Sequence, residues 1–148
     1  MSICQTEHLS LMKLHTADHL LFLRANQLLR QHGITIQQAL VLQYLASNTD
    51  SSINQKKIET YLGISNPSVT SLMKGMVAKN LIQRFPDRTD TRSHLLRLTP
   101  LGHQLQTSIA EAFLRLHNEL HAGLTAKESQ QLHTLLDKIT ANLTSLSE

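Results

Sequence analysis

The sequence predicts a mostly α-helical protein that carries one small β-hairpin. Three observations support this fold class. Apolar residues recur at helical spacing over most of the 148 residues, two short strand-like runs flank a turn-rich loop at residues 86–93, and capping or turn residues separate the periodic segments. Because aromatic residues make up only 3% of the chain, we expect a core of aliphatic and methionine side chains.

The first part of the chain predicts three helices with recognisable ends. The first, from about Thr6 to Gln31, repeats leucine every seven residues and stops before Gly33, which can adopt the left-handed cap conformation. Thr35 can cap the helix over TIQQALVLQYLAS, and Asn54 can cap a short helix over QKKIETYL.

The segment SNPSVTSLMKGMVAKN predicts a fourth helix that pairs with the short one. Ser65 or Asn66 caps it, Pro67 occupies its first turn, and Asn80 can end it in the left-handed region. A helix enters the major groove of DNA only if its outer face carries short side chains near the N-terminus and a basic one further along. Four residues meet this description: Ser68, Thr70, Ser71 and Lys74. The pair therefore predicts a helix-turn-helix with Asn66–Asn80 as the base-reading helix.

Two strand-like runs, LIQRF and HLLRLT, predict an antiparallel hairpin joined by the loop Pro86–Ser93, which we call the wing. In the second run, alternation places Leu96 and Leu98 inward. It places three residues outward: Leu95, Arg97 and Thr99.

Four arginines lie on this hairpin. We expect Arg92, with Arg88 as a second candidate, to enter a DNA minor groove, which is narrow and electronegative. Asp90 is expected to accept N–H groups of the loop and to hold an arginine in register. Arg84 and Arg97, on the stems, would contact phosphates or anchor the wing internally. A surface hairpin with incidental charge is the alternative.

The last part of the chain predicts two more helices. The first runs from Pro100 to about Ala122, and Gly123 ends it. Thr125 and Glu128 form a T-x-x-E capping box for the second, which carries a strong leucine stripe.

The charge distribution indicates one lobe that binds a polyanion. The formal net charge is +3, yet residues 54–97 contain eight Lys and Arg against three Asp and Glu, which leaves −2 for the remainder. We therefore expect a winged helix-turn-helix DNA-binding lobe at residues 34–99. Residues 1–33 and 100–148 would form a helical dimerisation region.

Other classes of protein are disfavoured. No nucleophile–base pair, phosphate-binding glycine loop or paired carboxylates are apparent, so no enzymatic activity and no cofactor are expected. A single cysteine, no secretory signal and no apolar run of membrane-spanning length favour the cytoplasm.

Three motifs give the sequence a family resemblance. The segment ITIQQALVLQYL is similar to the motif L-T-x-x-Q-x-x-V-L-x-x-L. The segment VTSLMKGMVAKNLIQR is similar to V-T followed by a leucine-containing helix and G-L-I-x-R. The segment DTRSHLLRLTPLG is similar to D-x-R followed by L-x-L-T and G. The chain thus resembles the MarR-type (multiple antibiotic resistance regulator) winged-helix regulators over nearly its whole length. The matching positions are Thr35, Gln38, Val41, Leu42, Leu45, Val69, Thr70, Leu81, Ile82, Arg84, Asp90, Arg92, Leu96, Leu98, Thr99 and Gly102. The departures, Glu59, Val77 and Asn80, bear on the subfamily.

The resemblance implies a homodimer with one DNA-binding lobe per subunit, hence a pseudo-palindromic double-stranded DNA operator. It also implies a transcriptional regulator, and a repressor rather than an activator. A small organic effector, such as an anionic phenolic compound, would release this regulator from DNA. Lys56, Lys57 and Lys74 are expected at phosphates. The DNA-binding residues expected in all are Lys56, Asn66, Ser68, Thr70, Ser71, Lys74, Arg84, Arg88, Asp90 and Arg92.

Two alternatives remain open from the sequence. His15 and His19, and likewise His117 and His121, are four residues apart, so each pair could present two imidazoles to a metal or haem iron. Two such pairs among nine histidines only mildly exceed random placement, and interface or surface histidines are the simpler interpretation. Cys4 is expected as an inert thiol in a frayed terminus ahead of the first helix. The other alternative is a winged-helix protein-interaction module that does not bind DNA.

Overall fold

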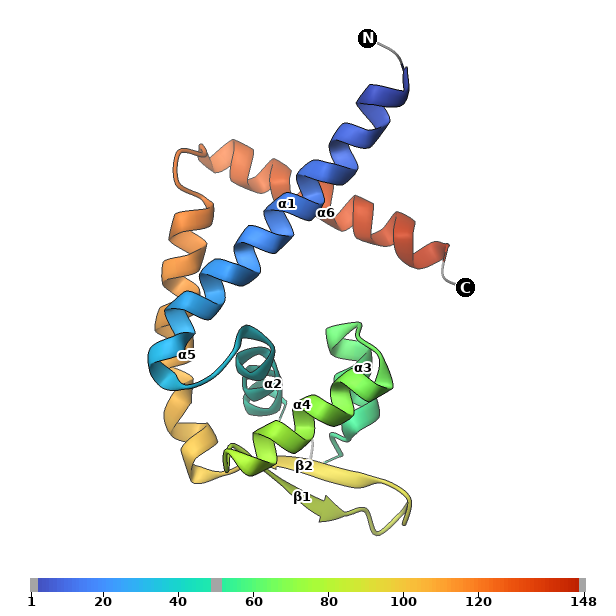
Figure 1. Ribbon diagram of the computed structural model, residues 1–148, viewed down its shortest axis with the longest axis vertical. Coiled ribbons are helices and arrows are strands. Elements are labelled where there is room, and N and C mark those ends of the chain that lie inside the picture. The colour runs from blue at the N-terminus through green and yellow to red at the C-terminus, as the bar shows by residue number, and fades with distance from the viewer. Residues whose placement is uncertain (1–2, 49–51, 147–148) are drawn as a thin grey trace. The chain divides into compact units, whose positions relative to one another are not determined.

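The computed structural model describes the backbone of residues 3–48 and 52–146 and the side chains from residue 8 onward (Figure 1). The fold class predicted from the sequence is confirmed, because six α-helices and one two-stranded hairpin follow in the expected order. The elements are α1 (Ile3–Leu29), a 3₁₀ turn (Arg30–His32), α2 (Ile36–Ser47), α3 (Gln55–Leu62), α4 (Asn66–Ala78), β1 (Ile82–Pro86), β2 (His94–Leu98), α5 (Pro100–Leu120) and α6 (Ala126–Ser145).

The chain divides into two compact units, Met1–Phe113 and Leu114–Glu148. The first contains α1 to α4, the hairpin and most of α5; the second contains the end of α5 and α6. This division shows only which parts of the chain pack compactly within themselves, and it does not assign a function to either part. The assignment of residues 34–99 to DNA binding and of the rest to dimerisation stays a prediction.

The predicted side-chain caps of α2, α3 and α6 form as expected, whereas Ser65, at the N-cap of α4, makes no side-chain cap bond. Thr35 and Gln38 make a reciprocal capping box at the start of α2, and the Asn54 side chain accepts the backbone N–H of Lys57 at 3.0 Å. Gly33 closes the 3₁₀ turn after α1 with φ 68°. Each cap satisfies backbone groups that a helix end leaves without an intrahelical partner.

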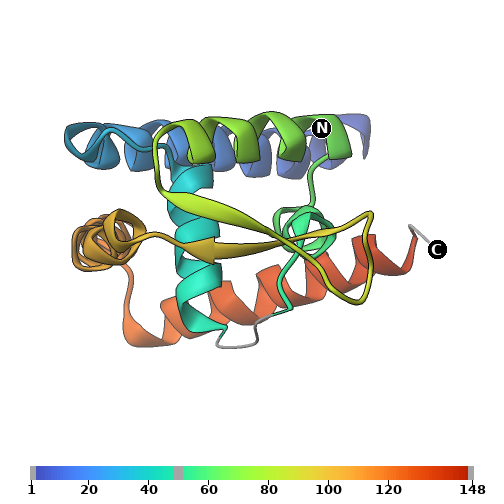
Figure 2. The ribbon, with the colours of Figure 1, turned by 90° about the horizontal axis from the view of Figure 1, so that it is seen from below.

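The core of the first unit is aliphatic and rich in methionine, as predicted. Its fully buried side chains come from five helices and the hairpin: Leu29, Val41, Leu42, Ile58, Val69, Met73, Met76, Ile82 and Ile109. In the view from below, the hairpin crosses in front of α2 and α3 with α4 beside it (Figure 2). β2 packs on α2 and α3, and β1 packs on α4. The hairpin is therefore held by the same core that holds α4.

The hairpin pairs in the antiparallel register Ile82↔Leu98 to Pro86↔His94. A short segment before α3 extends this sheet, because Asn54 bridges to Leu95 and the N–H of Leu96 donates to the carbonyl of Ile53 at 2.8 Å. The bridge leaves Leu95 half-buried.

Thr99 is a correction to the predicted alternation, because it points inward and is only 1% exposed. It lies one residue beyond β2, at the start of α5. Its hydroxyl lies 2.6 Å from the carbonyl of Asn80 and 3.0 Å from that of Leu81, and it accepts the N–H of Gly102 at 3.1 Å. Gly102 is required here because a Cβ would lie 2.4 Å from the Leu81 carbonyl. Thr99 therefore caps α5 and satisfies the turn between α4 and β1.

Two helix boundaries also differ from the prediction. α1 begins at Ile3, so the backbone of Cys4 lies inside this helix rather than ahead of it. No proline or glycine interrupts the segment from Ile3 to His8, and nothing there stops the helix. α5 ends at Leu120, two residues before the expected end, and Gly123 follows with φ 82°. In the part of the chain that the structure describes, no helix combines the length and apolarity of a membrane span.

Candidate nucleic-acid interface

α4 separates an inner from an outer face. Val69, Met73 and Met76 are fully buried against the rest of the lobe. The outer face carries exposed side chains that are small or polar near the N-terminus and basic further along: Asn66, Pro67, Ser68, Ser71 and Lys74. Asn80, with φ 57°, stands just beyond the helix as the sequence predicted. The arrangement leaves one narrow face of α4 open to solvent over its first two turns.

Thr70 differs from the other residues expected on this face. It is half-buried, and its hydroxyl accepts a hydrogen bond from the side chain of Gln55 at 2.7 Å. Since Gln55 begins α3, this bond joins the two helices of the helix-turn-helix. The structure therefore places Thr70 at the contact between α3 and α4 and not with the exposed side chains.

The start of α4 is tied to α3 by a second polar contact. The amide of Asn66 donates to one carboxylate oxygen of Glu59 at 3.3 Å, and Lys56 donates to the other oxygen at 3.3 Å. Beside them, the hydroxyls of Ser65 and Ser68 lie 3.0 Å apart. Glu59 was not among the expected site residues, because only the folded turn brings its carboxylate to Asn66.

The wing loop is organised by two aspartates. The carboxylate of Asp87 accepts both the hydroxyl of Thr89 at 2.7 Å and its backbone N–H at 2.9 Å, and these bonds lower the pKa of Asp87. The carboxylate of Asp90 accepts the backbone N–H of Arg92 at 3.0 Å. Asp90 therefore accepts a loop N–H group, as expected. Arg88 and Arg92 are exposed on this loop.

The two stem arginines differ in their surroundings. The Arg97 guanidinium lies over the ring of Phe85, 5.1 Å from its centroid, which matches the internal anchor foreseen for a stem arginine. Arg84, paired with Leu96 across the hairpin, is exposed. Arg84 is thus open to contact with a phosphate, while Arg97 stiffens the hairpin.

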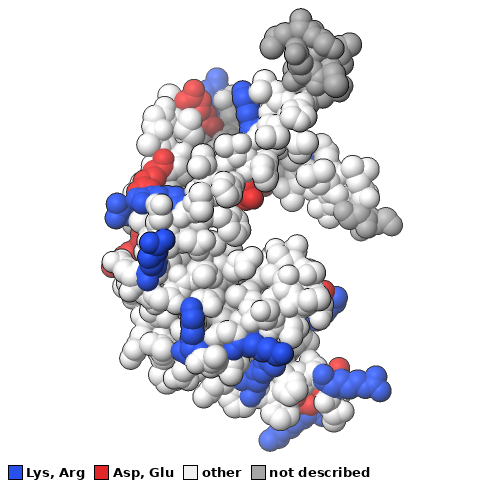
Figure 3. Space-filling view, viewed as in Figure 1, with Lys and Arg blue, Asp and Glu red and all other residues white. Residues whose placement is uncertain are grey.

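Positive charge gathers over α4 and the wing (Figure 3). Lys74 extends from the outer face of α4, and Lys57 donates to the hydroxyl of Ser52 at 2.9 Å beside the start of α3. Lys79 is exposed and donates to the carbonyl of Gly33 and to the side chain of Gln38, at 2.7 and 3.1 Å. The charge excess counted along residues 54–97 is therefore concentrated on the lobe that carries α4, and the Lys79 ammonium is engaged by groups of the same lobe.

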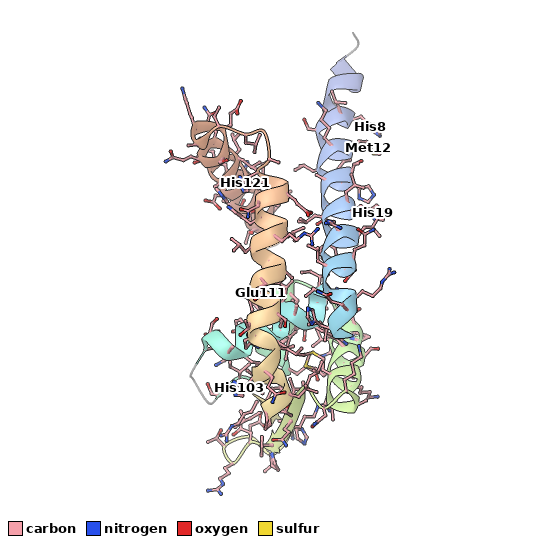
Figure 4. The ribbon with its side chains drawn as sticks, turned by 90° about the vertical axis from the view of Figure 1, so that its left-hand side faces the viewer. His8, Met12, His19, His103, Glu111 and His121 are labelled. Atoms are coloured by element: carbon pink, nitrogen blue, oxygen red, sulfur yellow. The ribbon has the colours of Figure 1, made fainter. Side chains whose placement is uncertain are left out.

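The two histidine pairs lie in different units of the chain. His15 and His19 are exposed on α1, where Figure 4 shows His8, Met12 and His19 following one another along the helix. In the second unit the rings of His117 and His121 lie 4.3 Å apart. Among residues 3–48 and 52–146, no three histidine, cysteine or acidic side chains are placed to hold a metal ion.

His121 has two contacts that the sequence did not indicate. Its ring stacks on that of His133 at 5.5 Å, and its Nδ1 lies 2.9 Å from the hydroxyl of Ser129. Burial, followed by the nearby His117 and His133, lowers the pKa of His121. The contact with His133 depends on the turn that joins α5 to α6.

Comparison with known proteins identifies this architecture. A profile of the MarR family matches residues 32–93, which include the helix-turn-helix and the wing loop. The crystal structure of the Staphylococcus aureus MepR–DNA complex superimposes with a TM-score of 0.83 at 27% identity, over 88% of this chain and 96% of that one. The chain resembles the MarR family in sequence over residues 32–93 and in fold over most of its length. The resemblance found in the sequence motifs is thereby confirmed.

Other known proteins resemble the chain as well. The reduced form of Escherichia coli MarR has a TM-score of 0.73 at 27% identity, over 86% of this chain and 93% of that one. The transcriptional regulator MgrA of Staphylococcus aureus is 27% identical over 115 residues, 78% of this chain and 76% of MgrA. SarZ of Staphylococcus epidermidis is 27% identical over 104 residues, 70% of this chain and 68% of SarZ. These two relatives are transcription regulators.

Proposed function

We propose that the protein is a homodimeric repressor that binds a pseudo-palindromic operator in double-stranded DNA. The observation that carries this proposal is the outer face of α4, where Asn66, Ser71 and Lys74 are exposed beside a loop that presents Arg88 and Arg92. A helix with this face fits the major groove, and arginines on a neighbouring loop suit the minor groove. The MepR structure, solved as a DNA complex, supports it.

The exposed apolar side chains of α1 support a dimer. Six of them are more than 40% exposed: Leu9, Leu11, Met12, Leu14, Leu20 and Leu23. A single helix that exposes this much apolar surface needs a partner, and a second copy of the chain offers the same surface. A two-fold dimer would place two copies of α4 about one helical turn of DNA apart.

The second unit has an apolar face of its own. α6 and the residue after it expose a leucine-rich stripe: Leu135, Leu136, Ile139, Leu143 and Leu146. We therefore assign residues 1–33 and 100–148 to dimerisation and residues 34–99 to DNA binding.

The effector is proposed from the family resemblance alone, as a small anionic phenolic compound that lowers operator affinity. Since its partner is DNA, we place the protein in the cytoplasm.

Two measurements test the proposal directly. Light scattering on the purified protein should give twice the monomer mass of 16.6 kDa. Selection from random duplexes, with the bound DNA sequenced, should yield an inverted repeat with half-sites about 10 base pairs apart. A panel of hydroxybenzoates added to the selected complex tests the effector. A monomer that enriches no duplex would contradict the proposal and favour the protein-interaction module.

A further inference from the structure

Glu59 holds the first residue of the base-reading helix by a charged hydrogen bond. It lies on α3 in the middle of the helix-turn-helix, and its side chain is 19% exposed. One carboxylate oxygen accepts the Asn66 amide at 3.3 Å, and the other accepts the Lys56 ammonium at 3.3 Å. Figure 1 shows the short turn that brings α3 and the start of α4 together.

The chemistry of this contact fixes the orientation of the Asn66 amide. An ionised carboxylate only accepts hydrogen bonds, so Asn66 must turn its Nδ2 group toward Glu59. The opposite orientation would set the amide oxygen against the carboxylate, and two acceptors repel. Glu59 therefore selects one of the two amide orientations and leaves Asn66 with Oδ1 as an acceptor and the second Nδ2 hydrogen as a donor.

This pair of groups matches one base better than the others in the major groove. Adenine presents an amino donor at N6 and an acceptor at N7, and an asparagine amide binds both at once. Cytosine offers its N4 donor alone, while guanine and thymine present acceptors, O6 and O4, where Asn66 presents an acceptor of its own. The oriented amide therefore selects adenine.

We propose that Glu59 is the positioning residue that gives Asn66 a preference for adenine at one base pair of each half-site. The inference rests on the proposed function, in which α4 lies in the major groove. Glu59 acts through Asn66, since its carboxylate is engaged by Asn66 and Lys56.

Glu59 has a second effect through Lys56. The carboxylate partly neutralises this ammonium, which is 76% exposed, and it places negative charge near the DNA backbone. Both effects weaken binding to arbitrary sequences, because non-specific affinity comes mainly from cations at phosphates. Removal of the carboxylate should therefore strengthen non-specific binding while the preference for adenine is lost.

Selection from random duplexes with the full-length protein and three variants tests the inference. Glu59→Gln keeps the size of the side chain but can donate as well as accept, so the Asn66 amide no longer has one favoured orientation. Asn66→Ala removes the amide itself from an exposed position. Glu111→Gln is the matched control, since it removes the same charge from an exposed site on α5 (Figure 4).

The wild-type protein and Glu111→Gln should enrich adenine at one position of each half-site, where replacement by guanine weakens binding about tenfold. Glu59→Gln and Asn66→Ala should reduce that discrimination below about threefold, at this position only. Glu59→Gln should also bind an unselected duplex more tightly, with a salt dependence steeper by about one phosphate contact.

Two results would overturn the inference while the proposed function stands. One is an unchanged adenine preference in Glu59→Gln, and the other is an unchanged adenine preference in Asn66→Ala. Circular dichroism checks that each variant is folded. The Asn66→Ala variant identifies which base pair Asn66 contacts, independently of Glu59. If the wild-type protein enriches no sequence at all, the proposed function itself fails.

Discussion

The ammonium of Lys79 donates to the side-chain oxygen of Gln38 at 3.1 Å and to the carbonyl of Gly33 at 2.7 Å. Lys79 follows the end of α4, Gln38 belongs to the capping box of α2, and Gly33 closes the turn after α1. The Gln38 oxygen also accepts the N–H of Thr35 at 3.1 Å. One lysine thus links the C-terminal end of α4 to the junction of α1 and α2.

Lys79→Met should lower stability by about 1 kcal/mol, because the charged hydrogen bonds to Gln38 and Gly33 are lost while the stem of the side chain is kept. Urea denaturation measures this loss. Operator affinity should fall because the end of α4 is held less firmly, and its salt dependence should stay unchanged if Lys79 contacts no phosphate.

Lys74→Met is the matched control for Lys79→Met. It removes an exposed ammonium from α4, so it should leave stability unchanged and reduce the salt slope by about 0.9 if Lys74 contacts one phosphate. Equal salt slopes for the two variants would contradict the distinct roles assigned to the two lysines.

Arg92→Ala should weaken operator binding by about 1–3 kcal/mol and leave the dimer intact. Its backbone N–H is held by Asp90, which fixes the loop and leaves the side chain exposed. Fluorescence anisotropy gives the affinity and light scattering the mass. Arg115→Ala, which removes an arginine paired with Glu119 on α5, should not alter the affinity. Equal losses from both variants would assign the effect to total charge and not to the wing.

Thr99→Val should lower stability by about 2 kcal/mol, because the carbonyls of Asn80 and Leu81 and the N–H of Gly102 lose their hydroxyl partner. Thermal and urea denaturation measure the effect. Thr107→Val, an exposed substitution on the same helix, is the control and should change stability by less than about 0.5 kcal/mol. If Thr99→Val lowers stability no more than Thr107→Val does, water replaces the hydroxyl as the partner of these backbone groups.

Stability should fall as the pH is lowered past the ordinary pKa of histidine, in part through His121. Burial and the neighbouring His117 and His133 lower its pKa in the folded state, so protonation favours the unfolded chain. The contribution of His121 is complete above about pH 6.5 and is lost as the pH falls through the lowered value. Urea midpoints between pH 8 and pH 5 measure it.

His121→Gln should make the urea midpoint less dependent on pH in this range. If this variant retains the full dependence, the stack of His121 on its neighbours does not control it.

Local signals predicted much of this fold. Caps at Thr35, Asn54 and Thr125 act within four residues of themselves, so spacing along the chain was enough to place them. Thr99 was misplaced because strand alternation was extended one residue too far, into the start of α5. Its partners Asn80 and Leu81 lie 19 and 18 residues earlier, and no local pattern indicates them.

For the candidate site, the sequence predicted which positions are exposed but not the hydrogen bonds between helices. The exposed positions of α4 follow from helical periodicity, whereas the bonds of Thr70 to Gln55 and of Asn66 to Glu59 depend on how two helices pack across a turn. The stack of His133 on His121 likewise requires the turn between α5 and α6. Side-chain contacts between elements were thus the part that periodicity could not supply.

The salt dependence of operator affinity tests the central claim most directly. Fluorescence anisotropy with a duplex obtained by selection should show log affinity falling linearly with log salt concentration, by about 0.9 per phosphate contact, with the slope reduced in Lys74→Met. Affinity that does not change with salt, or no binding to any duplex at low salt, would contradict the assignment of α4 and the wing to DNA.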